Sequence, residues 1–285
     1  QYWQKVMSPT PEIAFGELPL DQSRENTKLI GTHRIKTYID QDTALGLFKI
    51  ASTHEASFHA LMLTLLAFET RRRTGRDEFV LGTTASSRET AEDNEVVGCF
   101  VNMLPLPYAL PDNITFGDLL RKTQQDLMGA LQHDRFPFAQ IYHDVWAQRP
   151  HLRHPLRFPL FDLVVTQNPT PEVIGGIFGR PSTADSALEY EFTAWPPGQD
   201  MVLVHEHQPD GAMMLEWHVN AEVYQRSTSH AWFQALVSWA RWLGEDPSRA
   251  NAPLPSLLPE ETRCLDSWQT GLTVSRPALC VHQLF

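Results

Sequence analysis

The feature of this sequence that most constrains its fold is an apolar segment at residues 57–68. Ser57 is suited to cap the start of a helix. The large apolar side chains that follow recur at helical spacing: Phe58, Leu61, Met62, Leu65 and Phe68. Because the residues between them are also mostly apolar, the segment predicts a helix that is buried almost all round.

Strand patterns and further helix patterns surround this segment. The predicted strands are residues 32–39, 78–85, 96–106, 160–167, 174–178, 188–193, 201–207 and 213–219. The predicted helices are residues 43–53, capped by Thr43; 115–131, opened by Thr115 with Asp118; 137–147; and a last one capped by Ser227, with Trp232, Phe233, Leu236, Val237, Ala240 and Leu243 as its buried stripe. This mixture predicts an α/β (α+β) sandwich, a sheet flanked by helices.

The chain divides into three parts by composition. Residues 1–30 are expected to be an extended lead-in, and residues 31–245 the main folded part. Residues 246–285 are rich in Pro and Leu and are expected to form a linker. The sequence starts without Met and stops without a terminating signal, so we expect a piece of a longer protein.

Composition excludes several classes of protein. Hydrophobic residues make up 42% and charged residues 20%, which is ordinary for a globular chain and rules out a disordered or fibrous one. The net charge of −11 argues against nucleic acid or an anionic membrane as a partner. The longest apolar stretch is too short to cross a bilayer. Three scattered cysteines favour the reducing cytoplasm, and no GxSxG, P-loop or GxGxxG motif is present.

Histidines two residues apart in a predicted strand raise the question of a metal site. His205 and His207 would lie on one face of the strand, as some zinc sites require. No third ligand accompanies them, so we interpret the pair as part of an exposed or packed strand face and predict that the chain binds no metal.

Two further segments contain polar or aromatic residues in unusual places. Asn102 is an amide inside the apolar segment 97–105, so it must find hydrogen-bond partners or face a cavity. Those partners could be neighbouring backbone groups, or the amide could face a cavity. Residues 133–138 (HDRFPF) are consistent with the end of one helix and a proline-initiated start of the next, with an aromatic pair in the core.

Taken together and in this order, these segments resemble the C-terminal lobe of condensation domains in nonribosomal peptide synthetases. Residues 97–103 (VGCFVNM) are similar to the family's VGxFVNT, and residues 133–139 (HDRFPFA) to its HQDxPFE. Residues 153–161 (RHPLRFPLF) resemble RDxSRNPLF, with both arginines kept but Asp, Ser and Asn lost. Residues 82–88 resemble the family's Gly-to-Arg strand and loop, and residues 281–285 the start of an adenylation domain.

The resemblance implies a chloramphenicol acetyltransferase-like lobe with a mixed sheet. Such a lobe pairs with an N-terminal lobe around a tunnel, where a donor acyl thioester is joined to the amine of an acceptor aminoacyl thioester. Both substrates are attached to phosphopantetheine arms of carrier proteins, and no cofactor is bound directly. The implied partners are the N-terminal lobe, donor and acceptor carrier proteins, and a following adenylation domain. The residues implied for the tunnel or its motifs are Arg88, Gly98, Phe100, Asn102, His133, Pro137, Phe138, Arg153 and Arg157.

The family's catalytic motif, HHxxxDG, lies on the N-terminal lobe, so the resemblance implies no catalytic residue in this chain and no activity for the chain alone. Residues 205–211 (HEHQPDG) are similar to that motif but carry Glu206 in place of its second histidine. An unpaired exposed glutamate is a poor general base near neutral pH, so we interpret this segment as a hairpin. The alternatives are a noncatalytic carrier-binding module, an epimerisation or heterocyclisation relative, and, less consistent with residues 281–285, an independent acetyltransferase of the same fold.

Overall fold

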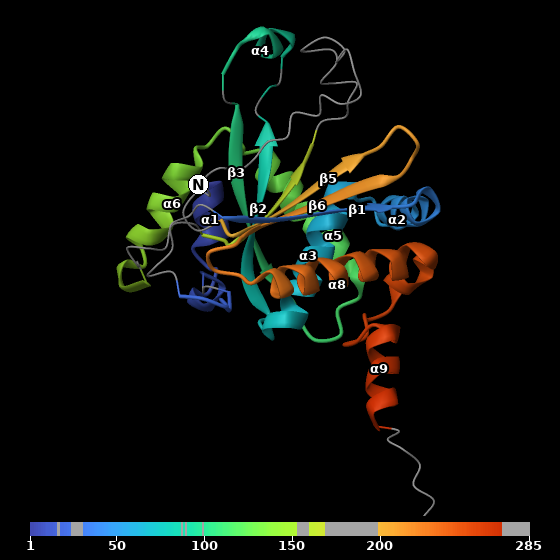
Figure 1. The fold of residues 1–285 in the computed structure, drawn as a ribbon. Coiled ribbons are helices and arrows are strands. Elements are labelled where there is room, and N and C mark those ends of the chain that lie inside the picture. The colour runs from blue at the N-terminus through green and yellow to red at the C-terminus, as the bar shows by residue number, and fades with distance from the viewer. Residues whose placement is uncertain are drawn as a thin grey trace, which may run out of the picture. The chain divides into compact units, whose positions relative to one another are not determined.

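The computed structural model describes residues 1–15, 18–23, 31–86, 88, 90–98, 100–152, 160–168 and 199–269. Residues 1–254 and residues 255–285 form two separate compact units. The first unit is built on a six-stranded sheet with the order β1-β6-β5-β4-β2-β3 (Figure 1). Its strands are β1 (Thr32–Ile39), β2 (Glu78–Ser86), β3 (Val101–Ala109), β4 (Leu163–Gln167), β5 (Met201–His207) and β6 (Met213–Asn220).

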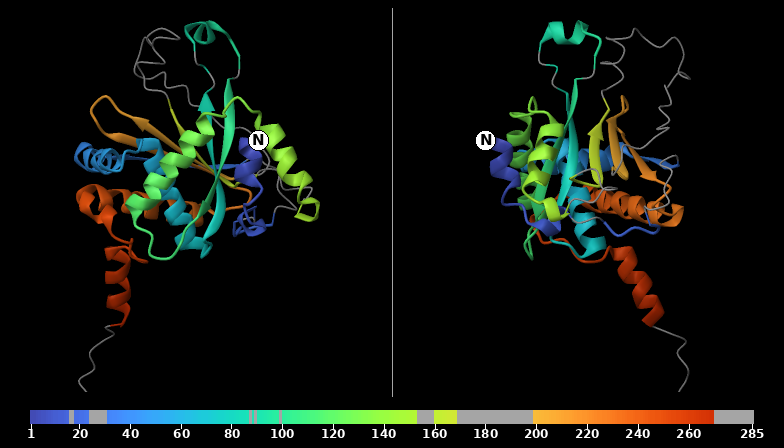
Figure 2. Two further views of the ribbon diagram at one scale, coloured as in Figure 1. Left: turned by 180° about the vertical axis from the view of Figure 1, so that it is seen from behind. Right: turned by 90° about the vertical axis from the view of Figure 1, so that its left-hand side faces the viewer.

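The sheet is mixed, as predicted. Strand β4 runs parallel to both of its neighbours, β2 and β5, while the other pairs are antiparallel. The carboxyl ends of β2, β4 and β5 therefore meet at one edge of the sheet. Strands β2 and β3 extend beyond the others and carry the short helix α4 (Ala91–Glu95) at their tip (Figures 1 and 2).

Helices α2 (Gln41–Thr53), α3 (Phe58–Thr74) and α8 (Arg226–Glu245) pack over one face of the sheet. The ring of Trp217 in β6 stacks on that of Phe233 in α8, with centroids 6.4 Å apart. The predicted buried stripe of α8 is confirmed, because all six of its predicted residues are buried. The remaining helices of this unit are α1 (Tyr2–Met7), α5 (Phe116–Leu131), α6 (Phe138–Ala147) and the 3-10 helices η1 (Glu12–Phe15), η3 (Pro150–Leu152) and η4 (Pro247–Asn251).

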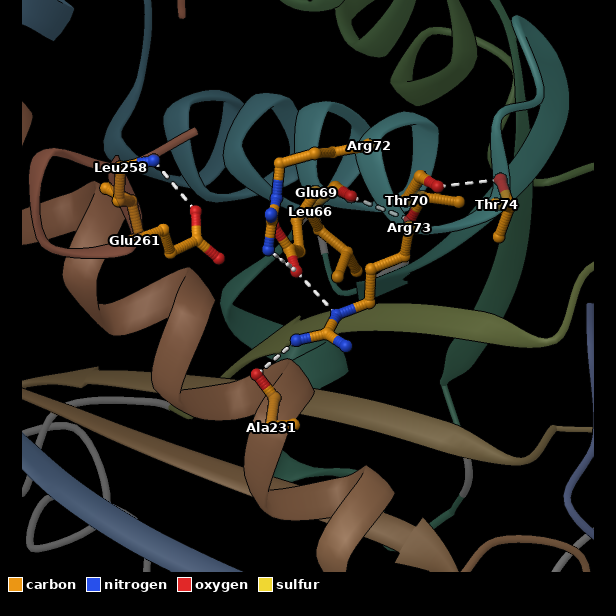
Figure 3. A network of polar contacts seen from close by, with 9 residues as sticks. All are labelled: Leu66, Glu69, Thr70, Arg72, Arg73, Thr74, Ala231, Leu258 and Glu261. Atoms are coloured by element: carbon orange, nitrogen blue, oxygen red, sulfur yellow. Dashed lines mark hydrogen bonds and ion pairs between the residues drawn. The ribbon is translucent and has the colours of Figure 1, made fainter. Parts of the chain in front are cut away.

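Helix α3 is buried almost all round, as predicted, and its burial includes a carboxylate. Glu69 is fully buried and accepts hydrogen bonds from Arg72 at 2.8 Å and Arg73 at 2.6 Å (Figure 3). Arg73 also donates to the carbonyl oxygen of Ala231 near the start of α8. A buried charge is costly unless it is paired, so this network compensates Glu69 and joins the two helices.

Some predicted boundaries are wrong for local physical reasons. The N-cap of α2 is Asp40 rather than Thr43, because its carboxylate accepts from the backbone N–H of Thr43 at 2.9 Å. Helix α8 begins at Arg226 with Gln225 as its N-cap, so Ser227 lies inside the helix. Strand β3 begins at Val101 rather than residue 96.

Other predicted segments also differ. The predicted loop at residues 86–95 contains α4, and the predicted extended lead-in contains α1 and η1, which bury Trp3, Met7 and Phe15. The predicted strands at residues 174–178 and 188–193 lie outside the described residues. In the second unit the described residues form α9 (Pro259–Gln269), where the Glu261 carboxylate accepts from the backbone N–H of Leu258 at 2.8 Å (Figure 3). Among the described residues, no helix is long and apolar enough to cross a membrane.

Candidate functional site

Asn102, at the start of β3, joins two segments that are distant in the sequence. Its side-chain nitrogen donates to the carbonyl oxygens of Asp134 at 2.6 Å and Phe136 at 2.8 Å. Its side-chain oxygen accepts from the backbone N–H of Phe138 at 3.1 Å. These bonds satisfy an amide that would otherwise be costly in an apolar strand. All three partners are backbone groups of this chain, which is the arrangement that the structural alternative for Asn102 requires.

Arg88, Gly98 and Phe100 come together beside α4. The guanidinium group of Arg88 donates to the carbonyl oxygens of Asp93 and, at 3.1 Å, Gly98. It also lies over the ring of Phe100, 4.1 Å from the centroid. Three residues named from sequence motifs thus form one local cluster, held by hydrogen bonds and a cation–π contact.

Exposed apolar side chains lie close to this cluster in the sequence. Val97 is fully exposed, Val101 is 58% exposed and Val96 is 51% exposed. Large apolar residues gathered on an exposed surface often mark an interaction site. The tip of the β2–β3 extension is therefore a candidate contact surface, which the sequence pattern alone had assigned to the interior of a strand.

His133 belongs to the contact between the first helix and α5. Its ring stacks on that of Tyr2, with centroids 4.0 Å apart and planes within 5°. Its Nδ1 is 2.9 Å from the carbonyl oxygen of Gly129, and its own carbonyl oxygen accepts from the indole of Trp3 at 3.2 Å. The structure thus gives His133 a packing role against α1.

Pro137 and Phe138 begin α6. Pro137 is the N-cap residue, immediately before the position predicted for it, and Phe138 packs against Phe161 with ring centroids 5.5 Å apart. Phe161 in turn lies on Gly82 of β2, where an added Cβ would be 2.2 Å from its ring. The absence of a side chain at Gly82 is what lets this ring approach the sheet. Arg153 and Arg157 lie outside the described residues.

A buried chain of hydrogen bonds at the carboxyl ends of β2, β4 and β5 was not predicted from the sequence. Thr83 donates its hydroxyl hydrogen to the carbonyl oxygen of Val165 at 3.0 Å, so its oxygen accepts from His59 Nε2 at 2.7 Å. His59 Nδ1 is then bare and accepts from His205 Nε2 at 2.8 Å. This order requires the imidazole of His59 to be neutral, because one of its nitrogens donates and the other accepts.

The surroundings of the two imidazoles favour the same neutral state. Burial lowers the pKa of His59 to about 4. Burial, together with the nearby His59, lowers the pKa of His205 to about 3. His207 lies on the same face of β5, and its ring stacks on Phe48 with centroids 5.3 Å apart. Among the described residues no cluster of three or more His, Cys, Asp or Glu side chains could hold a metal ion.

Glu206 points to the opposite face of β5 from His205. Its carboxylate accepts hydrogen bonds from the side-chain amides of Asn168 at 3.2 Å and Gln208 at 2.9 Å. The turn that follows it is a hairpin, in which Asp210 accepts from the backbone N–H of Ala212 at 3.0 Å and Gly211 has a φ of 84°. Residues 205–211 therefore form a strand end and a hairpin turn, as predicted, with the first two side chains on opposite faces.

Comparison with known proteins decides the family. A family model described as "Condensation domain" matches residues 1–265. The chain belongs to the condensation domain family. Its relatives include surfactin synthase subunit 1 of Bacillus subtilis (strain 168), 24% identical over 293 residues, and bacitracin synthase 3 of Bacillus licheniformis, 25% identical over 292 residues. Both alignments cover 100% of this chain but only 8% and 4% of the relatives.

Solved structures of condensation-like domains share the fold. The holo-AB3403 four-domain nonribosomal peptide synthetase aligns with a TM-score of 0.73 at 15% identity, over 92% of this chain and 20% of that chain. The condensation domain of the Monacolin K polyketide synthase MokA aligns with a TM-score of 0.66 at 19% identity, over 86% of this chain and 56% of that chain. The X-domain from teicoplanin biosynthesis aligns with a TM-score of 0.71 at 19% identity, over 86% of this chain and 54% of that chain. The predicted chloramphenicol acetyltransferase-like architecture is confirmed.

Proposed function

We propose that these residues form the C-terminal lobe of a nonribosomal peptide synthetase condensation domain. In this proposal the lobe supplies one wall of the substrate tunnel and part of the carrier-docking surface. An N-terminal lobe supplies the catalytic base. The complete domain joins a donor acyl or peptidyl thioester to the amine of an acceptor aminoacyl thioester, each attached to the phosphopantetheine arm of a carrier protein.

The observation that carries this proposal is the extent of the structural match. The alignments cover most of this chain but only 56% of the MokA condensation domain and 54% of the teicoplanin X-domain. About half of each solved domain thus has no counterpart in these 285 residues, and the printed sequence contains no HHxxxDG motif. Its nearest approach, residues 205–211, places His205 in a buried neutral chain and Glu206 on the other face of the sheet.

The exposed valines beside α4 support a contact surface for the other lobe. Val96, Val97 and Val101 lie next to the Arg88–Phe100 cluster at the tip of the β2–β3 extension. Burial of these side chains by a partner would stabilise the complex by about 25 cal/mol per Å² of apolar surface. We also propose that an adenylation domain follows this lobe and that the protein acts in the cytoplasm.

A condensation assay tests the proposal in two steps. The chain alone, mixed with aminoacyl-loaded donor and acceptor carrier proteins, is expected to bind the carriers but to form no peptide. The same chain joined behind an N-terminal lobe that contains HHxxxDG is expected to form peptide. Peptide formation by the chain alone, or no carrier binding in either form, would contradict the proposal.

A noncatalytic carrier-binding module of the same fold is the second candidate. It is favoured by the similarity to the teicoplanin X-domain, which has also been solved in a complex with OxyB. The cyclization part of the EpoB bidomain gives a TM-score of 0.67, so heterocyclisation relatives share the fold too. If the chain joined behind the N-terminal lobe binds carriers and leaves their substrates unchanged, the carrier-binding module is favoured. A heterocyclic product would favour the cyclization relatives.

A further inference from the structure

We propose that Glu206 is a binding residue for a primary ammonium group, and specifically for the amine of the acceptor aminoacyl thioester. This inference rests on the proposed function and adds to it the residue that recognises the acceptor. It is carried by the hydrogen bonds of the carboxylate, by its charge and by its place in the sheet.

The carboxylate of Glu206 is held in a fixed orientation. Oε2 accepts from Asn168 at 3.2 Å and Oε1 accepts from Gln208 at 2.9 Å, so one neutral amide fixes each oxygen. An ionised carboxylate offers about four lone-pair positions, and the described residues donate to only two of them. Glu206 is only partly buried, so part of the residue can be reached from solvent.

No positive charge among the described residues compensates this carboxylate. Two more deeply buried carboxylates differ in this respect: Glu69 is paired with Arg72 and Arg73, and Glu216 is paired with Arg34. A partly buried carboxylate that is held by neutral amides alone favours a cation as its ligand. An ammonium group carries three donors and matches the free lone pairs.

The position in the sheet also suits a ligand. Glu206 lies near the carboxyl end of β5. The carboxyl end of β4 adjoins it and that of β2 follows next in the sheet, and open α/β sheets commonly bind ligands at such an edge. The hydroxyl groups of Thr84 and Thr166, 2.7 Å apart and partly exposed, continue the polar row on the same face. These hydroxyls offer additional hydrogen bonds to the amides of a pantetheine arm.

Calorimetric titration with two probes tests the inference. The first probe is a pantetheine that carries alanine through a stable amide, with its amine free. The second is the same molecule with that amine acetylated. We expect the wild-type chain to bind the free-amine probe at least about 10-fold more tightly, the range of a hydrogen bond to a charged group. Glu206→Gln is expected to bind both probes equally.

Two variants complete the design. Glu222→Gln removes a partly exposed carboxylate elsewhere in the chain and is expected to keep the full preference. Glu206→Asp keeps the charge but has a shorter side chain, so it is expected to reduce the preference for the free-amine probe. This variant still tests the inference if Glu206→Gln does not fold. Equal binding of both probes by the wild type, absence of binding, or an unchanged preference in Glu206→Gln would overturn the inference.

Carrier binding is measured separately, so the two proposals can fail independently. If holo-carrier protein binds without any preference for a free amine on its substrate, the role of Glu206 is wrong and the proposed function stands. If the free-amine probe is preferred but no carrier protein binds, the ammonium site stands and the proposed function is wrong.

Discussion

Replacement of Asn102 by alanine measures how much one amide contributes to the contact between β3 and the start of α6. The substitution removes two donated hydrogen bonds and one accepted bond, and it leaves the carbonyl oxygens of Asp134 and Phe136 and the N–H of Phe138 without this partner. Asn102 is only partly buried, so water reaches some of these groups. We therefore expect a loss of about 1 to 3 kcal/mol in the free energy of unfolding.

The assay is urea unfolding at pH 7, with Gln132→Ala as the control. Gln132 lies in the same region and is exposed, and none of the described residues bonds to its side chain, so its replacement should cost less than about 0.5 kcal/mol. Asn102→Asp should cost at least as much as Asn102→Ala, because a carboxylate would face two carbonyl oxygens. A stable Asn102→Ala chain, combined with reduced condensation in a complete two-lobed enzyme, would refute the structural role and favour a tunnel role.

Three further predictions concern stability. Glu69→Gln should cost about 3 kcal/mol because it breaks a buried ion pair, whereas Asp77→Asn, which removes an exposed partner of Arg71, should cost less than about 1 kcal/mol in the same unfolding assay. Gly82→Ala should cost about 1 to 3 kcal/mol, since its Cβ would lie 2.2 Å from the ring of Phe161, and Phe161→Leu should recover part of the loss. The pKa values of His59 and His205, about 4 and about 3, lie below the ordinary value of 6.5, so protonation favours the unfolded chain. The contribution of these two histidines to stability should therefore be constant above pH 6.5 and fall as the pH drops toward 3. If a doubly substituted His59→Gln, His205→Leu chain loses as much stability on acidification as the wild type does, the acid sensitivity does not come from these histidines.

The elements that the sequence predicts well are those with a clear apolar pattern. The helix at residues 57–68 and the strand at residues 32–39 match α3 and β1, because a capped apolar segment longer than an ordinary strand favours a buried helix and an alternating segment favours a strand. The predicted helix starts at Thr43 and Ser227 are wrong for different reasons. Asp40 caps α2 in place of Thr43, and α8 begins after Gln225 without a capping side chain. Residues 96–100 look apolar enough for a strand interior, yet Val96 and Val97 are exposed.

The candidate site was predictable only where a motif keeps neighbours together. Arg88, Gly98 and Phe100 lie within 13 residues of one another, and the structure brings them into one cluster. The chain of Thr83, His59 and His205 is different, because it joins β2, α3 and β5 across 146 residues. Only the sheet order places those strands side by side, and a local pattern contains no information about that order. A histidine in the first turn of an otherwise apolar helix is the one signal that could have suggested it.

The end of β5 shows why a motif match must be checked against the direction of its side chains. His205 and Glu206 are adjacent in the sequence, but the alternation of a strand sends one to the helix-covered face and the other to the opposite face. His205 is nearly fully buried, and its low pKa keeps it neutral without access to a substrate. Glu206 is accessible and oriented but lacks the adjacent imidazole that acyl transfer by this family's motif requires. The two residues therefore do not face each other as one acid–base pair would, which is why we propose a binding role for Glu206 and no proton-transfer role for the pair.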